Sequence, residues 1–201
     1  MFTSNMLLIH RDRVKRGSEA VYRTAEEDAA RFCARLGCPH PHLAVESLTE
    51  PIEVLWFNAL DSEAHKQQIV DAYASNGPLT TALAGIRTRR EGLLDLDVDV
   101  LARHEPELTR GGPWPLGRAR FLVVTMTRGD EVGEGAVYVA EDGTRFVFRP
   151  AEREAQAREA AAAAGREARV FAVRPYWGMA AKEWIAADPE FWSANPSSAA
   201  G

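Results

Sequence analysis

This sequence of 201 residues has few cysteines, no long apolar run and no excess of basic charge. Its two cysteines cannot make a disulfide framework, which is typical of a protein from a reducing compartment. No stretch approaches the roughly 20 apolar residues of a membrane span. The segment from Met1 to Ile9 is too short, and too soon followed by charge, for a secretory signal. We therefore expect a cytoplasmic protein without a membrane partner.

The charge balance and the missing motifs also exclude several functions. Lys and Arg number 24 against 29 Asp and Glu, a net charge of -5 with the two signs interspersed. Because no basic stripe could follow a phosphate backbone, we expect no nucleic-acid partner. A Gly-rich phosphate loop, a Ser-His-Asp spacing and a Cys nucleophile signature are absent. The 46% hydrophobic content is ample for a packed core.

The same order of predicted secondary-structure elements occurs twice along the chain, first complete and then shortened. Residues 7–95 read strand, helix, strand, strand, helix, strand, and residues 119–175 read strand, strand, strand, helix, strand. A split β-α-β unit covers only one face of its sheet with its own helices, so two such sheets can cover each other. This predicts an α+β fold in which tandem ferredoxin-like units pack their antiparallel sheets as an α+β barrel. The expected divisions are a first unit over 1–109, a second unit without its first helix over 116–192, and a disordered tail over 193–201.

Local patterns refine this expectation. The run IEVLWFNAL at 52–60 is nearly all apolar, which predicts a strand covered on both faces. Aspartates alternate with apolar residues over 94–100, which favours an exposed edge strand. In the helix predicted after Ser18, Glu26 falls on the polar face. The alanine-rich helix at 151–164 should lie on the surface, and the three tryptophans of the C-terminal segment should close a core.

Polar residues inside apolar strands are the candidates for chemistry, because a buried polar group needs a partner. We take His10, Glu46 and Asn58 as candidate general acid/base residues. A three-residue turn at 49–51 sets the expected cross-strand pairs: Glu46 with Val54, Ala44 with Trp56, and His42 with Asn58. The candidate ligand-binding residues are His42, Trp56, Tyr22 and Tyr73. The alternative is a polar network that is satisfied within the core.

Two further patterns suggest a metal or a haem. Cys33, Cys38, His40 and His42 form C-x4-C-x-H-x-H, which supplies four ligands of the kind that zinc prefers, although the spacing is not a recognised one. The competing interpretation is a buried free cysteine followed by a rigid turn, and we expect no metal site. His65 lies on a predicted helix, where a solvated histidine is the usual case.

Two passages resemble the dimeric α+β barrel superfamily, which includes the antibiotic-biosynthesis-type monooxygenases and the small haem-degrading enzymes. They are HRDRVKRGSEAVYRTAEEDAARF at 10–32 and EVLWFNALDSEAHKQQI at 53–69. The resemblance implies a barrel that members usually build from two chains, with a cavity between sheet and helices for a small hydrophobic molecule. It also makes His65 the position to consider for haem ligation. A tandem chain could build such a barrel alone, so both a monomer and a homodimer are open.

Three hypotheses for function follow. The first is a cofactor-free, monooxygenase-like enzyme that acts on a small apolar or aromatic ligand through His10, Glu46, Trp56 and Asn58. The second is a non-catalytic ligand-sensing or protein-interaction protein, in which the same residues are core. The third is a haem or metal protein. The identity of any cofactor is left open.

Overall fold

The computed structural model describes residues 4–112, 115–129 and 133–193, so residues 194–201 of the expected tail lie outside the described part. The elements of the first half are β1 (Met6–Val14), α1 (Glu19–Leu36), β2 (Leu43–Ser47), β3 (Glu53–Leu60), α2 (Glu63–Ser75), α3 (Gly77–Arg90) and β4 (Leu94–His104). Those of the second half are β5 (Phe121–Thr127), β6 (Ala136–Ala140), β7 (Arg145–Ala151), α4 (Glu154–Ala164), β8 (Ala168–Val173), α5 (Lys182–Ala187) and α6 (Pro189–Ser193). Among the described residues, no helix combines the length and the apolar character that crossing a bilayer requires.

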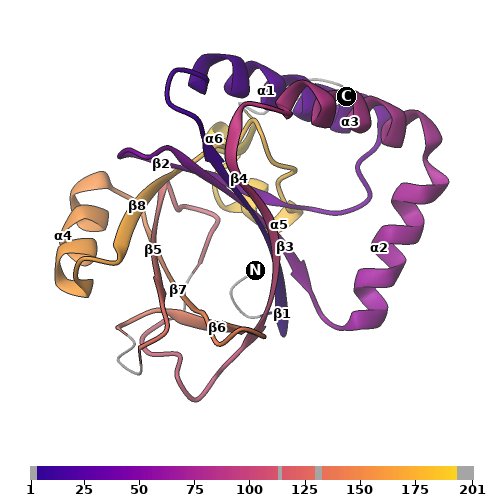
Figure 1. Cartoon of the computed structure of the whole chain (residues 1–201). Coiled ribbons are helices and arrows are strands. Elements are labelled where there is room, and N and C mark those ends of the chain that lie inside the picture. The colour runs from indigo at the N-terminus through magenta and orange to yellow at the C-terminus, as the bar shows by residue number, and fades with distance from the viewer. Residues whose placement is uncertain (1–3, 113–114, 130–132, 194–201) are drawn as a thin grey trace.

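The eight strands form one closed barrel in the order β1-β3-β2-β8-β5-β7-β6-β4, and every neighbouring pair is antiparallel (Figure 1). The first half contributes β4-β1-β3-β2 and the second half β8-β5-β7-β6. The pairs β2–β8 and β4–β6 join the two halves. The α+β class and the barrel are thus confirmed. The strand over 94–104 is not an edge, because barrel closure gives it a partner on both sides.

The register of the β2–β3 hairpin is the expected one. Glu46 lies opposite Val54, and Ala44 lies opposite Trp56. Because side chains alternate along a strand, Leu55 and Phe57 of β3 point into the barrel, whereas Trp56 and Asn58 point outward to the helices. The apolar run at 52–60 is therefore covered on both faces, as its composition predicts.

Aromatic and aliphatic side chains fill the barrel interior. Phe57 and Phe148 meet edge to face with ring centroids 5.2 Å apart, and both are fully buried. Trp184 of α5 and Trp192 of α6 belong to the same core cluster, and Trp192 Nε1 donates a hydrogen bond to the Gly117 carbonyl at 2.7 Å. These two tryptophans close a core, as the sequence predicts, and offer no exposed aromatic surface.

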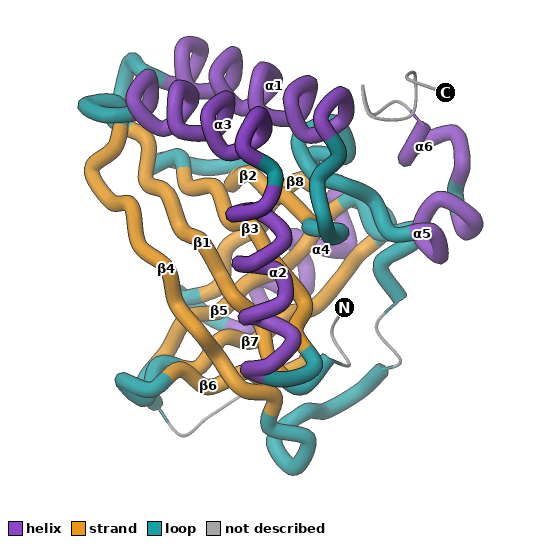
Figure 2. Tube along the Cα trace, turned by 90° about the vertical axis from the view of Figure 1, so that its right-hand side faces the viewer, coloured by secondary structure: helices purple, strands orange, loops and turns teal. Residues whose placement is uncertain are grey.

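The helices cover the outer faces unequally. In Figure 2, α1 and α3 lie side by side over one end of the strands, with α2 in front of the sheet. On the other half, α4 packs against β5 and β8 and buries only Ala157 and Ala160, as expected for an alanine-rich surface helix. Helices α1–α3 therefore contribute large and polar side chains to the space between them and the sheet, whereas α4 contributes alanine methyl groups.

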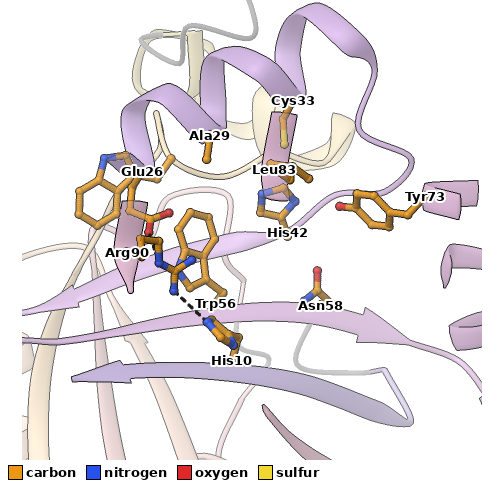
Figure 3. Close-up of a pocket in the computed structure, with 11 residues that line it drawn as sticks. His10, Glu26, Ala29, Cys33, His42, Trp56, Asn58, Tyr73, Leu83 and Arg90 are labelled. Carbon is orange, nitrogen blue, oxygen red and sulfur yellow. Dashed lines mark hydrogen bonds and ion pairs between the residues drawn. The ribbon is translucent and has the colours of Figure 1, made fainter. Parts of the chain in front are cut away.

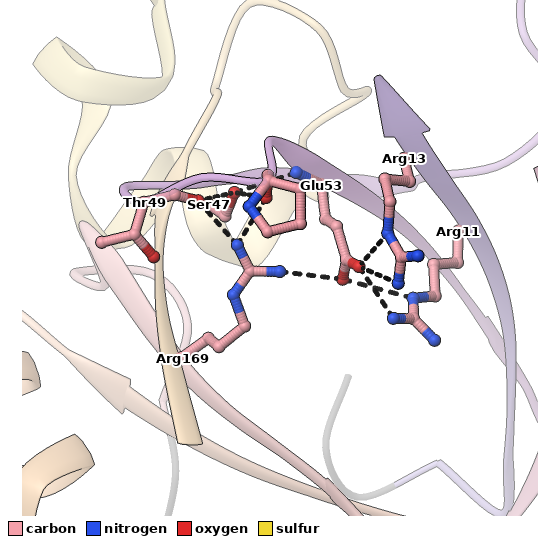
Figure 4. A network of polar contacts seen from close by, with 7 residues as sticks. Arg11, Arg13, Ser47, Thr49, Glu53 and Arg169 are labelled. Atoms are coloured by element: carbon pink, nitrogen blue, oxygen red, sulfur yellow. Dashed lines mark hydrogen bonds and ion pairs between the residues drawn. The ribbon is translucent and has the colours of Figure 1, made fainter. Parts of the chain in front are cut away.

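A buried carboxylate ties three strands together within the barrel wall (Figure 4). Glu53 is 1% exposed, and it accepts hydrogen bonds from Arg11 Nη2 at 2.8 Å and from Arg13 Nε at 2.9 Å. Arg169 Nη1 of β8 lies 3.2 Å from the same carboxylate, and Arg169 Nη2 donates to the carbonyls of Thr49 and Pro51. Burial opposes ionisation of Glu53, but the arginines outweigh it and lower the pKa of this carboxyl.

Candidate functional site

A pocket of about 180 Å³ lies between the outer face of the first-half sheet and the helices α1, α2 and α3 (Figure 3). The lining residues come from β1, β3 and the three helices of that half, from the residue just before β2, and from the segment after β8. They are His10, Glu26, Ala29, Cys33, His42, Trp56, Asn58, Tyr73, Leu83, Arg90 and Trp177.

Helix α1 presents one face to this pocket. Tyr22, Glu26, Ala29 and Cys33 follow one another at steps of four, three and four residues, which places them on one side of a helix. Glu26 is 2% exposed. The expectation that Glu26 lies on the polar, outward face is therefore wrong, because the helix turns this glutamate toward the sheet.

Aromatic rings form the wall on the sheet side. Trp56 stacks on Trp177 with ring centroids 6.4 Å apart and planes 20° apart, and His42 lies 5.6 Å from Trp56. The Nε1 atoms of Trp56 and Trp177 are buried and have no hydrogen-bond partner among the described residues. Buried N–H groups are nearly always paired, so we expect a ligand or water to supply acceptors here.

Trp177 is far from the pocket in sequence, and a short bridge brings it there. His42 and Met179 exchange two backbone hydrogen bonds of 3.0 Å, which holds the segment after β8 beside the start of β2. At Gly178 a Cβ atom would lie 2.5 Å from the His42 carbonyl oxygen, so only glycine allows this approach. The bridge thereby fixes Trp177 against Trp56.

A compact ion network forms the polar wall. Arg90 pairs with the fully buried Asp12, and Arg90 Nε lies 3.2 Å from Glu26 Oε1. Tyr22 donates a 2.7 Å hydrogen bond to Asp12. His10 Nε2 lies 3.1 Å from Asp12 Oδ1 and 3.1 Å from Arg90 Nη2, the contact that is dashed in Figure 3. Two cationic groups therefore balance two buried carboxyls.

The network shifts two pKa values into useful ranges. Burial raises the pKa of Glu26 to about 7, although the charge of Arg90 opposes the shift. Burial alone would lower the pKa of His10, but the charge of Asp12 and the hydrogen bonds that His10 donates to Asp12 and Asp99 raise it to about 9. The raised pKa favours the imidazolium form of His10 at neutral pH, in which Nε2–H donates to Asp12 and not to Arg90, while the pKa of Glu26 suits proton exchange.

Five of the seven predicted site residues line the pocket: His10, His42, Trp56, Asn58 and Tyr73. The other two, Tyr22 and Glu46, are buried outside the lining. Glu46 is 1% exposed, and it pairs with Arg23 Nε at 2.8 Å and with Arg174. The Glu46 carboxylate is thus satisfied within the protein, which is the alternative that the sequence left open.

Sequence reasoning missed Glu26, Asp12, Arg90 and Trp177. The spacing of Glu26 from Tyr22, Ala29 and Cys33 was a signal that could have placed it on the buried face. Arg90 and Asp12 are 78 positions apart, and only the packing of α3 over β1 joins them. No local pattern marks such a pair.

The cysteine-histidine motif does not form a tetrahedral site. Among the described residues, three or more potential ligand atoms lie within 4.8 Å of one another only at His10, Asp12 and Asp97. In the motif, Cys38 Sγ lies 3.9 Å from His42 Nδ1, while His40 Nε2 donates to Asn58 instead.

Two other positions bear on metal or haem binding. At His10, Asp12 and Asp97, the guanidinium of Arg90 already supplies the cation that Asp12 needs, so a metal ion would have to displace it. His65 takes part in the N-terminal capping of α2: its backbone N–H donates to the N-cap Ser62, and its Nδ1 accepts a 3.2 Å hydrogen bond from the Asp61 backbone. It does not line the pocket.

Comparison with known proteins identifies a fold and no family. No family model matches the chain, and no curated protein matches its sequence. Among solved structures, a Fusobacterium nucleatum protein named "Putative monooxygenase" is similar, with a TM-score of 0.52 and 12% identity. The match covers 86% of this chain and 94% of that one. The likeness shows that the two proteins share a barrel fold.

Proposed function

We propose that this protein binds a small apolar or aromatic molecule between its sheet and helices, and acts on it as a cofactor-free, monooxygenase-like enzyme. One observation carries the proposal: Glu26, a carboxyl with a pKa of about 7, is buried in a pocket walled by stacked aromatic rings. Strongly shifted groups in such clefts are typical of acid/base sites.

The dimensions of the pocket suggest the size of the ligand. An apolar cavity of roughly 150 Å³ takes up benzene, and this pocket has about 180 Å³. A single substituted ring fits that space, stacked on the Trp56 indole. The unpartnered indole N–H groups of Trp56 and Trp177, together with the Asn58 amide, favour a ligand that carries oxygen acceptors.

The charged groups suggest the chemistry. The carboxylate of Glu26 would take a proton from an activated C–H bond of the ligand, and the resulting enolate would lie beside the cations Arg90 and His10. These positive groups lower the energy of the anion without any metal. His10 and Asn58, which the sequence offered as acid/base candidates, take ligand-contacting roles in this proposal, and Glu26 takes the acid/base role in place of Glu46.

An electron-rich enolate can supply all the electrons that O2 needs. When an activated methylene becomes a ketone, one oxygen atom of O2 forms the new carbonyl and the other leaves with both methylene hydrogens as water. The substrate is oxidised by four electrons and O2 is reduced by four, so no external reductant is required.

We also propose that the two halves are tandem ferredoxin-like units. The matching strand orders, β4-β1-β3-β2 and β8-β5-β7-β6, support this relationship. The second unit has no helix between β5 and β6 within the described residues. Because the closed barrel needs no strand from a second copy, a monomer is the favoured state.

The test combines binding and turnover. The protein is incubated under ¹⁸O2 with single-ring phenols and with cyclic ketones that carry an activated methylene. Binding is followed by tryptophan fluorescence, and the label in the product by mass spectrometry. We expect labelled product from the wild type, and from Glu26→Gln retained binding with turnover reduced at least tenfold. Equal turnover by Glu26→Gln would contradict the assigned base, and binding without turnover by the wild type would favour a ligand sensor.

A further inference from the structure

The C-terminal end of α1 brings the two cysteines of the chain together. The helix ends at Gly37 with φ 79°, and the backbone N–H of Cys38 then donates a 3.0 Å hydrogen bond to the Cys33 carbonyl. In this type of helix end, the side chains of the two bonded residues lie on the same side and commonly touch. Both cysteines are free thiols. The backbone geometry, which depends on glycine at position 37, therefore places the two cysteine side chains on the same side of the helix end.

The surroundings distinguish the two sulfur atoms. Cys38 is half-buried, and its Sγ lies 3.1 Å from the Tyr73 hydroxyl and 3.9 Å from His42 Nδ1. Cys33 is 6% exposed and lines the pocket. A hydrogen bond from the Cys33 thiol is the largest cause that lowers the pKa of Cys38. Burial raises the pKa of Cys38 and so opposes this effect, whereas His42 and Tyr73 lower the pKa further. The same pairing raises the pKa of Cys33, so the negative charge resides on Cys38.

We propose that Cys38 is a peroxide-reactive thiolate and Cys33 its resolving thiol, and that the two form a reversible disulfide at the wall of the pocket. A reactive cysteine of this kind is partly accessible and stands next to a second thiol. The proposal does not depend on the ligand or on the reaction assigned to the pocket.

The chemistry balances with hydrogen peroxide as the oxidant. The Cys38 sulfur attacks one peroxide oxygen, the O–O bond breaks, and the departing hydroxide takes up a proton to become water. This leaves a sulfenic acid on Cys38. The Cys33 sulfur then gives up its proton, attacks the Cys38 sulfur and expels the hydroxyl as a second water. Two thiols and one peroxide yield one disulfide and two waters, and a dithiol reductant reverses the reaction.

Mass spectrometry of the full chain tests the proposal. Reduced protein is treated with one equivalent of hydrogen peroxide, denatured, alkylated with N-ethylmaleimide and analysed both intact and as peptides. We expect a monomer in which neither cysteine is alkylated and in which Cys33 is linked to Cys38, with both thiols restored by dithiothreitol. Zinc is measured in the untreated sample.

Variants assign the two roles. Cys33→Ser, which keeps a hydrogen-bond donor beside Cys38 but cannot form a disulfide, should stop at a Cys38 sulfenic acid that dimedone traps, and Cys38→Ala should stay reduced at the same dose. Circular dichroism of each reduced variant verifies its fold. The proposal is overturned by a wild type that keeps both cysteines alkylatable, by disulfides between chains, by a Cys38→Ala variant that reacts as fast as the wild type, or by bound zinc that protects the thiols. The wild-type outcomes hold even if a variant does not fold.

Discussion

Replacing Glu26 by Gln should change the pH dependence of stability in a direction that the structure determines. The folded-state pKa of Glu26 is raised from its ordinary value of 4.5 to about 7. Below pH 4.5, the carboxyl is protonated in both the folded and the unfolded chain and has no effect. Between the two values it ionises only in the unfolded chain, so stability falls as pH rises. Above the folded pKa, the full penalty remains.

The size of the effect follows from the shift. One pKa unit corresponds to about 1.4 kcal/mol, so the shift destabilises the folded protein by about 3 kcal/mol at high pH, and most of this develops between pH 5 and pH 8. Glutamine resembles the protonated carboxyl and has no such penalty. The stability of Glu26→Gln relative to the wild type should therefore increase by about 2–3 kcal/mol over this interval.

Urea denaturation of both proteins near pH 5 and near pH 8 measures this difference directly, because all other titrating groups are shared and cancel. Glu27→Gln, at the adjacent helical position and outside the pocket lining, is the matched control for removal of one negative charge from α1. A difference between Glu26→Gln and the wild type that stays constant between the two pH values would refute the assignment of Glu26 as a buried carboxyl of raised pKa.

Three further substitutions test other parts of the structure. Trp56→Ala should cost about 2–4 kcal/mol of stability and weaken ligand binding at least tenfold. If stability falls but the ligand affinity in a fluorescence titration is unchanged, Trp56 is a core residue and not a ligand contact. Glu53→Gln should destabilise at pH 7. Its difference from the wild type should shrink as the pH falls below the ordinary carboxyl pKa and vanish only below the lowered folded-state pKa, and a series of urea midpoints from pH 7 downward measures this. Tyr73→Phe removes the hydroxyl beside Cys38 and should raise the pKa of that thiol, seen as a shift of the thiolate absorbance in a pH titration; an unchanged titration would contradict the contact.

The barrel could be predicted from the sequence because its signals are local. The unbroken apolar run at 52–60 indicated two covered faces, and the short turn at 49–51 determined the register of β2 against β3. The strand at 94–104 was misjudged as an edge, because its second neighbour is β6, which begins more than thirty residues further along the chain. Alternation of polar and apolar residues indicates which face of a strand is exposed to solvent, but it does not indicate whether the strand has a hydrogen-bonded neighbour on each side.

The candidate site was only partly predictable for the same reason. Outward-facing polar residues of the strands, such as His10 and Asn58, stand out against apolar neighbours. Whether such a residue is free to act depends on groups that are remote in sequence: Glu46 is neutralised by Arg174, 128 positions away. Conversely, Glu26 was missed although its own helix carries the spacing, because a charged side chain counts against burial in any pattern based on hydrophobicity.

The location of the site follows from the inequality of the two halves. Both halves give four strands to one barrel, so both have an outer face that a helix layer must cover. In the second half, α4 lies close to the sheet because it buries only alanines. In the first half, α1 and α3 bring Glu26 and Arg90, and these side chains place charge between the helices and the sheet. The aromatic segment after β8 then closes this layer through Trp177. The second half thus completes the barrel and supplies one wall of the pocket, and Glu26 and Arg90 belong to the half in which a helix joins the first two strands.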